Sequence, residues 1–125
     1  MSTSVAGLLD RARQRIHRVG PRELQGVIAE GGLVVDIRPS AQRQEEGSLP
    51  GALIVERNVL EWRFDPVGPH RLPEALGGDQ PVVIVCSEGF ASSLAAASLT
   101  DLGYTRAADL IGGYMAWRAW FGEGT

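Results

Sequence analysis

Cys86 is the only cysteine in this chain of 125 residues, and it stands where an apolar run meets a short polar loop. The run 82–85 is uniformly β-branched, and an alanine-rich segment begins a few residues after the cysteine. This pattern indicates a buried strand, a tight loop and a helix. The first amides of a helix have no partner within the helix and favour an anion. We therefore expect Cys86 to act as a thiolate nucleophile, surrounded by Ser87, Glu88, Gly89, Phe90, Ala91 and Ser92.

The residues alone leave an alternative open for Cys86. Free cysteine is among the most buried residue types, so the thiol could be an inert group that ends a strand. The glycine-containing loop and the helix after it favour the reactive thiol instead. The chain has no cluster of cysteine and histidine with the spacing of a metal site, and we expect neither a metal nor an organic cofactor.

The composition limits the classes of function. A length of 125 residues fits one domain, and the net charge of −3 argues against a general nucleic-acid binder. Residues 1–20 contain no long apolar run, so we expect neither a signal peptide nor a membrane span. A single cysteine cannot form an intrachain disulfide, which favours a reducing compartment and a cytoplasmic location.

Four apolar runs predict strands, and helical patterns lie between them. The expected strands are 33–38, 52–55, 81–85 and 107–111, and the expected helices are 4–18, 21–30, 41–46, 92–102 and 113–120. This alternation predicts an α/β fold with a parallel sheet covered on both faces. Ligands bind such sheets beyond the carboxyl ends of the strands, so the residues to inspect are 36–38, 56–58, 86–92 and 112–113.

Four motifs in order support a resemblance to a known family. They are VVDIR (34–38), EGSLPGA (46–52), VVIVCSEGFAS (82–92) and LIGGYMAW (110–117). Through them, residues 19 to 120 resemble the rhodanese (sulfurtransferase) family, particularly its small single-domain members. The resemblance implies a five-stranded parallel sheet with helices on both faces. It divides the chain into an N-terminal helical extension (1–18), one domain (19–121) and a loose tail (122–125).

The same resemblance implies a sulfurtransferase activity. Cys86 would take sulfane sulfur as a persulfide, from thiosulfate or a protein persulfide, and pass it to a thiol or to cyanide. We expect Asp36 and Arg38 to brace the active-site loop by hydrogen bonds and an ion pair, with direct substrate binding by Arg38 as the alternative. The implied partner is a small sulfur compound or a sulfur-relay protein, with no nucleic acid and no membrane, and the chain would be a monomer or a homodimer.

Two positions depart from the family pattern. Ala91 stands where many members carry arginine, and Ser48 stands where histidine is usual. Without the loop arginine we expect weak activity on thiosulfate, unless Arg57 or Arg63 replaces it in space. The alternative is a regulatory module with little or no activity. Related phosphatases have a longer loop with arginine at the position of Ser92, and phosphoryl transfer needs such a cation, so this activity is the least favoured.

Overall fold

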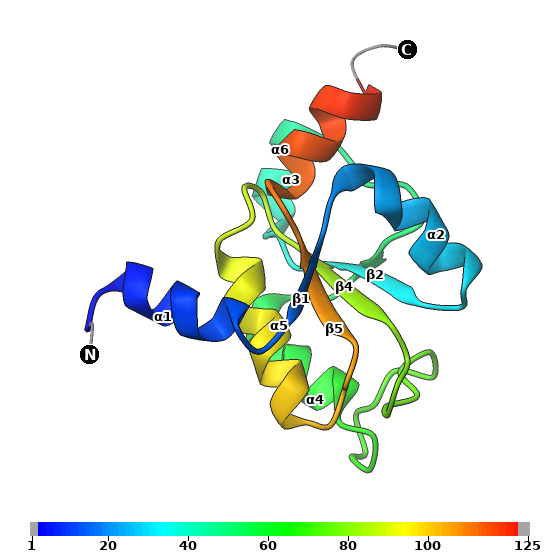
Figure 1. Ribbon diagram of the computed structural model, residues 1–125. Helices are drawn as coiled ribbons and strands as arrows, with labels where there is room; N and C mark the ends of the chain where they lie inside the picture. The colour runs from blue at the N-terminus through cyan, green and yellow to red at the C-terminus, as the bar shows by residue number, and fades with distance from the viewer. Residues whose placement is uncertain (1–2, 123–125) are drawn as a thin grey trace.

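Five parallel strands form one sheet at the centre of the computed structural model, which describes residues 3–122 (Figure 1). The order across the sheet is β1-β5-β4-β2-β3. The strands are β1 (His17–Val19), β2 (Leu33–Asp36), β3 (Leu53–Ile54), β4 (Val82–Val85) and β5 (Ala107–Leu110). Every pairing is parallel, and helices cover both faces, so the expected α/β fold is confirmed.

β1 is the strand that the apolar pattern does not predict. The helix expected over residues 4–18 ends at Arg13, and His17 begins an edge strand instead. This strand pairs with β5, and the carbonyl of Val19 accepts a hydrogen bond from the amide of Ile111 at 2.8 Å. None of its three residues is buried. Because its pairing relies on the main chain, the strand carries no apolar run that could reveal it.

One face of the sheet is covered by α5 (Ala91–Asp101) and α4 (Leu60–Phe64). Successive residues of a strand point to opposite faces, so Val82 and Ile84 of β4 lie on this side. The small side chains Ala95 and Ala96 of α5 are fully buried against them, which lets the helix lie close to the sheet. The sulfur-bearing residue Cys86 belongs to the same apolar cluster.

The other face is covered by α2 (Leu24–Ala29) and α6 (Gly113–Trp117). A 3-10 turn over Pro21–Glu23 leads into α2, and a π-helical segment over Arg118–Gly122 continues α6. Both helices lie within the ranges that the sequence predicts. The buried residues of this cluster are Leu24, Val34, Leu49, Val83, Val85, Ala108, Leu110 and Tyr114.

Two short elements follow β2 and β3 at the carboxyl ends of the strands. α3 (Ser40–Glu46) follows β2, and a 3-10 turn (Arg57–Val59) follows β3 and leads into α4. Because all five strands are parallel, these segments lie at the same edge of the sheet as the loop after β4.

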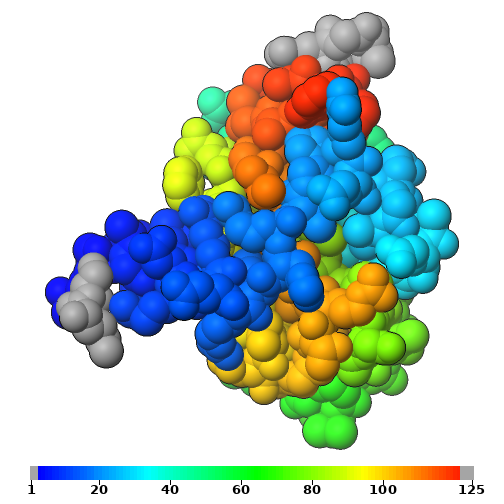
Figure 2. Space-filling view, in the orientation of Figure 1, coloured from blue at the N-terminus to red at the C-terminus, as the bar shows by residue number. Residues whose placement is uncertain are grey.

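α1 (Val5–Arg13) packs outside this core, against α5. Its buried face includes Leu9 and Ala12. Figure 2 shows the N-terminal segment (blue) lying across the molecule, with α1 projecting from its side. The expected boundary between residues 18 and 19 falls inside β1, and residues 123–125 of the expected tail lie outside the described residues.

Within residues 3–122, no helix combines the length and the apolar character needed to cross a lipid bilayer.

Tyr104 offers a test of this packing. Its hydroxyl is buried and donates a hydrogen bond to the carbonyl of Phe64 at 2.7 Å. Tyr104→Phe should lower the free energy of unfolding at pH 7 by about 1 kcal/mol, because the carbonyl loses its partner. The measurement is urea unfolding followed by circular dichroism.

The same residue predicts an alkaline effect. Burial raises the pKa of the Tyr104 hydroxyl, whereas an unfolded tyrosine has a pKa of about 10. The unfolded state therefore loses its proton first, and this contribution to stability falls as the pH rises above about 10. We expect Tyr104→Phe to lose less stability than the wild type between pH 9 and pH 11. An equal loss in both proteins would contradict the prediction.

Candidate active site

The sulfur of Cys86 accepts two main-chain hydrogen bonds from the loop that follows it. The amide of Gly89 lies 3.2 Å from Sγ, and the amide of Ser92 lies 3.3 Å from it. Ser92 is in the first turn of α5, where amides have no partner within the helix. Cys86 is buried, with 9% of its surface exposed. Two amides aimed at a sulfur stabilise negative charge on it.

Gly89 makes this arrangement possible because of its backbone. Its φ is +88°, a conformation that residues with a side chain rarely adopt. A Cβ at this position would also lie 2.8 Å from the amide nitrogen of Gly112 and 3.1 Å from the carbonyl oxygen of Leu110. The loop therefore closes tightly against the segment that follows β5.

The two glycines at the start of α6, Gly112 before the helix and Gly113 as its first residue, contact the loop from the side of β5. Gly113 has a φ of +66°, and a Cβ on it would lie 2.6 Å from the carbonyl oxygen of Cys86. The next two amides, of Tyr114 and Met115, donate to the carbonyls of Cys86 and Ser87 at 2.8 and 3.0 Å. The motif Gly112-Gly113 thus lets α6 hold the start of the active-site loop.

A buried ion pair connects the end of β2 to the same loop. The guanidinium of Arg38 donates to both carboxylate oxygens of Asp36 and, at 3.1 Å, to Glu46. The other carboxylate oxygen of Glu46 accepts a hydrogen bond from the hydroxyl of Ser87 at 2.7 Å. Burial of Arg38 opposes its charge, but the hydrogen bonds and charges of Asp36 and Glu46 outweigh burial and raise the pKa of the guanidinium.

A pocket of about 350 Å³ opens beside Cys86. Arg57 lines it and forms an ion pair with Glu61, in which Nη1 of Arg57 lies 3.0 Å from both carboxylate oxygens. Burial would raise the pKa of the Glu61 carboxyl, but its own backbone hydrogen bond and the charge of Arg57 lower it. The pocket is lined by Ile37, Arg38, Pro39, Gln42, Glu56, Arg57, Asn58, Cys86 and Ala91.

A comparison with protein families identifies the fold. The family model for the rhodanese-like domain matches residues 20–119. The chain belongs to the rhodanese-like family.

Relatives with curated names agree with this assignment. The thiosulfate sulfurtransferase GlpE of Pseudomonas fluorescens (strain SBW25) is 31% identical over 81% of this chain and 84% of its own length. The adenylyltransferase and sulfurtransferase UBA4 of Candida albicans is 31% identical over 80% of this chain. This chain spans 23% of the length of the Candida protein.

A solved structure resembles nearly the whole chain. It is a protein of unknown function from Rhodopseudomonas palustris, described as a possible tyrosine phosphatase. The TM-score is 0.84 at 29% identity, and the match covers 96% of this chain and 92% of the other.

The expected site residues lie in different surroundings: at the sulfur, at the pocket, in the ion-pair network or in solvent. Gly89 and Ser92 contact the sulfur, and Ala91 lines the pocket. Glu88 is exposed, and Phe90 is 56% exposed, so both side chains face solvent. The remaining expected residues Ser87, Asp36, Arg38 and Arg57 lie in the buried ion-pair network or at the pocket, as described above.

Sequence reasoning missed a second network beneath the loop. Asp109 of β5 is fully buried and accepts hydrogen bonds from the hydroxyls of Ser92 and Ser93 at 2.8 and 2.7 Å. Arg18 of β1 forms an ion pair with the same carboxylate at 2.8 Å. The signal available in the sequence is an aspartate inside the apolar run 107–111, because an isolated buried carboxylate requires partners.

Gly89→Ala tests how far the site depends on this backbone. The variant should lower the free energy of unfolding by about 1–3 kcal/mol, because alanine is strained at this φ and its Cβ meets backbone atoms. The rate at which iodoacetamide alkylates Cys86 should also change, because the amide that donates a hydrogen bond to Sγ would be displaced. Urea unfolding and mass spectrometry provide the two measurements.

The matched control is Gly26→Ala, where nothing lies within 4 Å of the new Cβ. Because Gly26 lies inside α2, this variant should be stabilised by about 0.5–1 kcal/mol with unchanged alkylation. If both variants behaved alike, the special role of Gly89 would be rejected.

Proposed function

We propose that this protein is a sulfurtransferase that carries sulfane sulfur as a persulfide on Cys86. The observation that carries the proposal is the pair of main-chain amides on Sγ, at 3.2 and 3.3 Å, beside an open pocket. Membership of the rhodanese-like family and relatives named as sulfurtransferases support it. Because the chemistry needs a reduced thiol, we further propose that the protein is cytoplasmic. We also propose that it acts as a monomer or a homodimer.

The proposed reaction proceeds in two displacement steps, and atoms and electrons balance in each. The Cys86 thiolate attacks the sulfane sulfur of the donor, and the bond from that sulfur to the rest of the donor breaks. Sulfite, or the thiolate of a protein donor, leaves with the electron pair. An acceptor thiolate or cyanide then attacks the outer sulfur, and Cys86 leaves as a thiolate. The amides of Gly89 and Ser92 stabilise the negative charge that returns to sulfur.

The charges around the pocket favour a donor other than thiosulfate. Arg57 is paired with Glu61, and Arg38 is bound by Asp36 and Glu46. Glu56 also lines the pocket, and Ala91 provides no cation. A small dianion would therefore find little positive charge here, so a persulfide on a thiol or a sulfur-relay protein is the donor class we propose.

Two other functions make different predictions. A phosphatase, as the Rhodopseudomonas palustris structure is described, would need a cation to match the phosphate oxygens. Residues 87–92 include no lysine or arginine, and the hydroxyl of Ser92 is bound to Asp109. A regulatory module with this fold would bind a partner without forming a persulfide.

The direct test is the mass of the protein after exposure to a donor. After incubation with a cysteine desulfurase and cysteine, or with thiosulfate, the wild type should gain one sulfur atom. Cys86→Ser should gain none, since it keeps the size of the side chain but not the thiol. If neither donor adds sulfur to the wild type and cyanide releases no thiocyanate, the sulfurtransferase proposal fails.

Ala91→Arg tests the proposed donor class. Ala91 is exposed and lines the pocket, so an arginine there adds an unpaired cation beside Cys86. The variant should raise kcat/KM for thiosulfate by about tenfold, the effect of one favourable charge contact on the donor. Thr105→Arg is the control, because Thr105 is exposed before β5, at the opposite end of the sheet. Equal activity of the two variants would contradict the role of the missing cation.

A further inference from the structure

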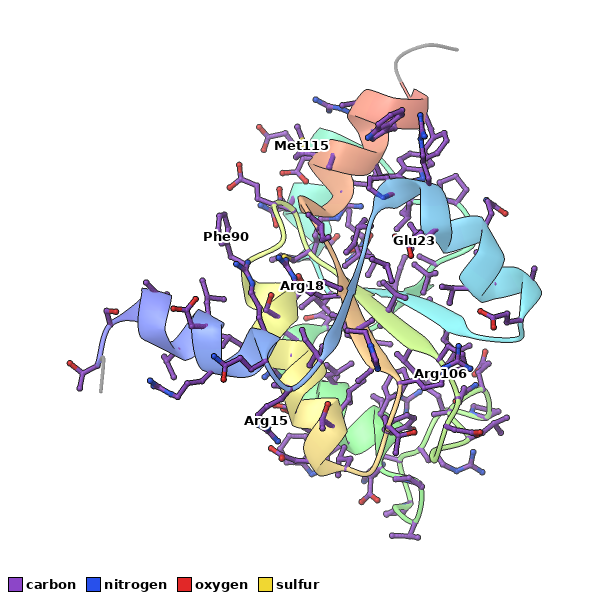
Figure 3. All side chains as sticks on the ribbon, in the orientation of Figure 1. Arg15, Arg18, Glu23, Phe90, Arg106 and Met115 are labelled. Atoms are coloured by element: carbon purple, nitrogen blue, oxygen red, sulfur yellow. The ribbon has the colours of Figure 1, made fainter. Side chains whose placement is uncertain are left out.

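Two arginines from the N-terminal segment reach the active-site loop. Arg13, the last residue of α1, donates to the carbonyl of Gly89 at 2.9 Å and to the hydroxyl of Ser93 at 3.0 Å. Arg18 of β1 donates to the same Gly89 carbonyl at 3.2 Å. The guanidinium of Arg13 also lies over the ring of Phe90, 5.9 Å from its centre. Figure 3 shows Arg18 and Phe90 near the start of α5, whereas Arg15 lies toward its other end.

The carboxylate of Asp109 connects Arg18 to the start of α5, and Arg13 joins the same network through the hydroxyl of Ser93. Arg18 donates to both oxygens of Asp109, at 2.8 and 3.2 Å, and the hydroxyls of Ser92 and Ser93 donate to one of them. Asp109 is fully buried, so its interactions are screened little by water. The five polar side chains that meet here belong to Arg13, Arg18, Ser92, Ser93 and Asp109.

The two residues whose amides donate to the sulfur are the residues that this network holds. Gly89 donates its amide to Sγ, and its carbonyl accepts from both arginines. Ser92 donates its amide to Sγ, and its hydroxyl donates to Asp109. Each of the two sulfur contacts is therefore supported through the second polar group of the same residue.

We propose that Arg13 and Arg18 are positioning residues, through which the N-terminal segment (residues 3–19) holds the active-site loop in place. Both residues precede the stretch 20–119 that the family model matches. They act from the outer side of the loop, on a carbonyl, rather than from the pocket. Their effect on sulfur transfer rests on the proposed function, but their effect on the loop geometry does not.

Arg13 is the better residue to test. Removing Arg18 would leave the buried Asp109 with only its serine partners, and such a variant loses stability for that reason alone. Arg13 is half-buried and forms no ion pair with Asp109. Arg13→Met therefore removes the contacts to Gly89 and Ser93 without leaving a buried charge unpaired. Arg13→Lys keeps a donor that can reach one of the two acceptors.

Arg15→Met is the matched control. Arg15 lies in the same segment but pairs with Asp101, an exposed residue at the far end of α5. The variant weakens the contact between the N-terminal segment and α5 without touching the loop. Any effect that arises only from looser packing of α1 should appear in this control as well.

The first measurement is hydrogen exchange of the Gly89 and Ser92 amides by NMR. Arg13→Met should accelerate both by about tenfold, the factor expected for loss of a charge-assisted hydrogen bond. Arg13→Lys should restore part of the protection, and Arg15→Met should match the wild type. Exchange in Arg13→Met that equals the Arg15→Met values would overturn the proposal.

The second measurement is the single-turnover rate of persulfide formation. Arg13→Met should lower the rate constant at saturating donor while the apparent donor affinity stays the same, because the pocket is unchanged. A change in affinity alone would reject the positioning role. If the wild type forms no persulfide with either donor, the proposed function fails, and the exchange measurement still decides whether Arg13 positions the loop.

Discussion

Two hydrogen bonds from main-chain amides to the sulfur of Cys86 are the interaction on which the rest of this structure depends. They require a loop that turns back on itself within six residues, so that Gly89 and Ser92 both face Sγ. The glycine provides the positive φ of that turn, and the first turn of α5 provides an amide without a helical partner. The strand before the loop is buried on both faces and gives Cys86 a rigid base.

The buried carboxylates of Asp36 and Asp109 and the half-buried carboxylate of Glu46 brace this loop on two sides. On one side, Asp36 and Glu46 bind Arg38, and Glu46 accepts a hydrogen bond from the hydroxyl of Ser87. On the other side, Asp109 accepts a hydrogen bond from the hydroxyl of Ser92 and forms an ion pair with Arg18. Buried charges are costly unless they are paired and hydrogen-bonded, and both networks meet this condition. Polar groups that would stabilise an ordinary core poorly are thus used to fix the direction of a few amides.

The sequence predicted the elements that pack and the bracing pair Asp36 and Arg38, but it missed the edge strand β1 and the network of Arg13, Arg18 and Asp109. Four strands and the helix α5 were predictable because their apolar runs and alanine content reflect burial. β1 was not, since an edge strand of three residues needs only main-chain partners. The loop around Cys86 was predictable from the order strand, glycine, helix. Its contacts with Arg13 and Arg18 were not, because they join residues more than 70 positions apart and no local pattern records them.

The position of the cations has a consequence for the chemistry of the pocket. An arginine inside the loop would both hold the loop and attract an anionic donor. Here Arg13 and Arg18 hold the loop, because both bind the Gly89 carbonyl from outside. No cation stands at the position of Ala91 to attract an anionic donor. The main-chain dipoles then act on the sulfur itself rather than on the charge of the donor. On the proposed function, we infer that such a site selects sulfur donors by their access to Cys86, and that the rigidity of its loop matters more than the charge of the loop.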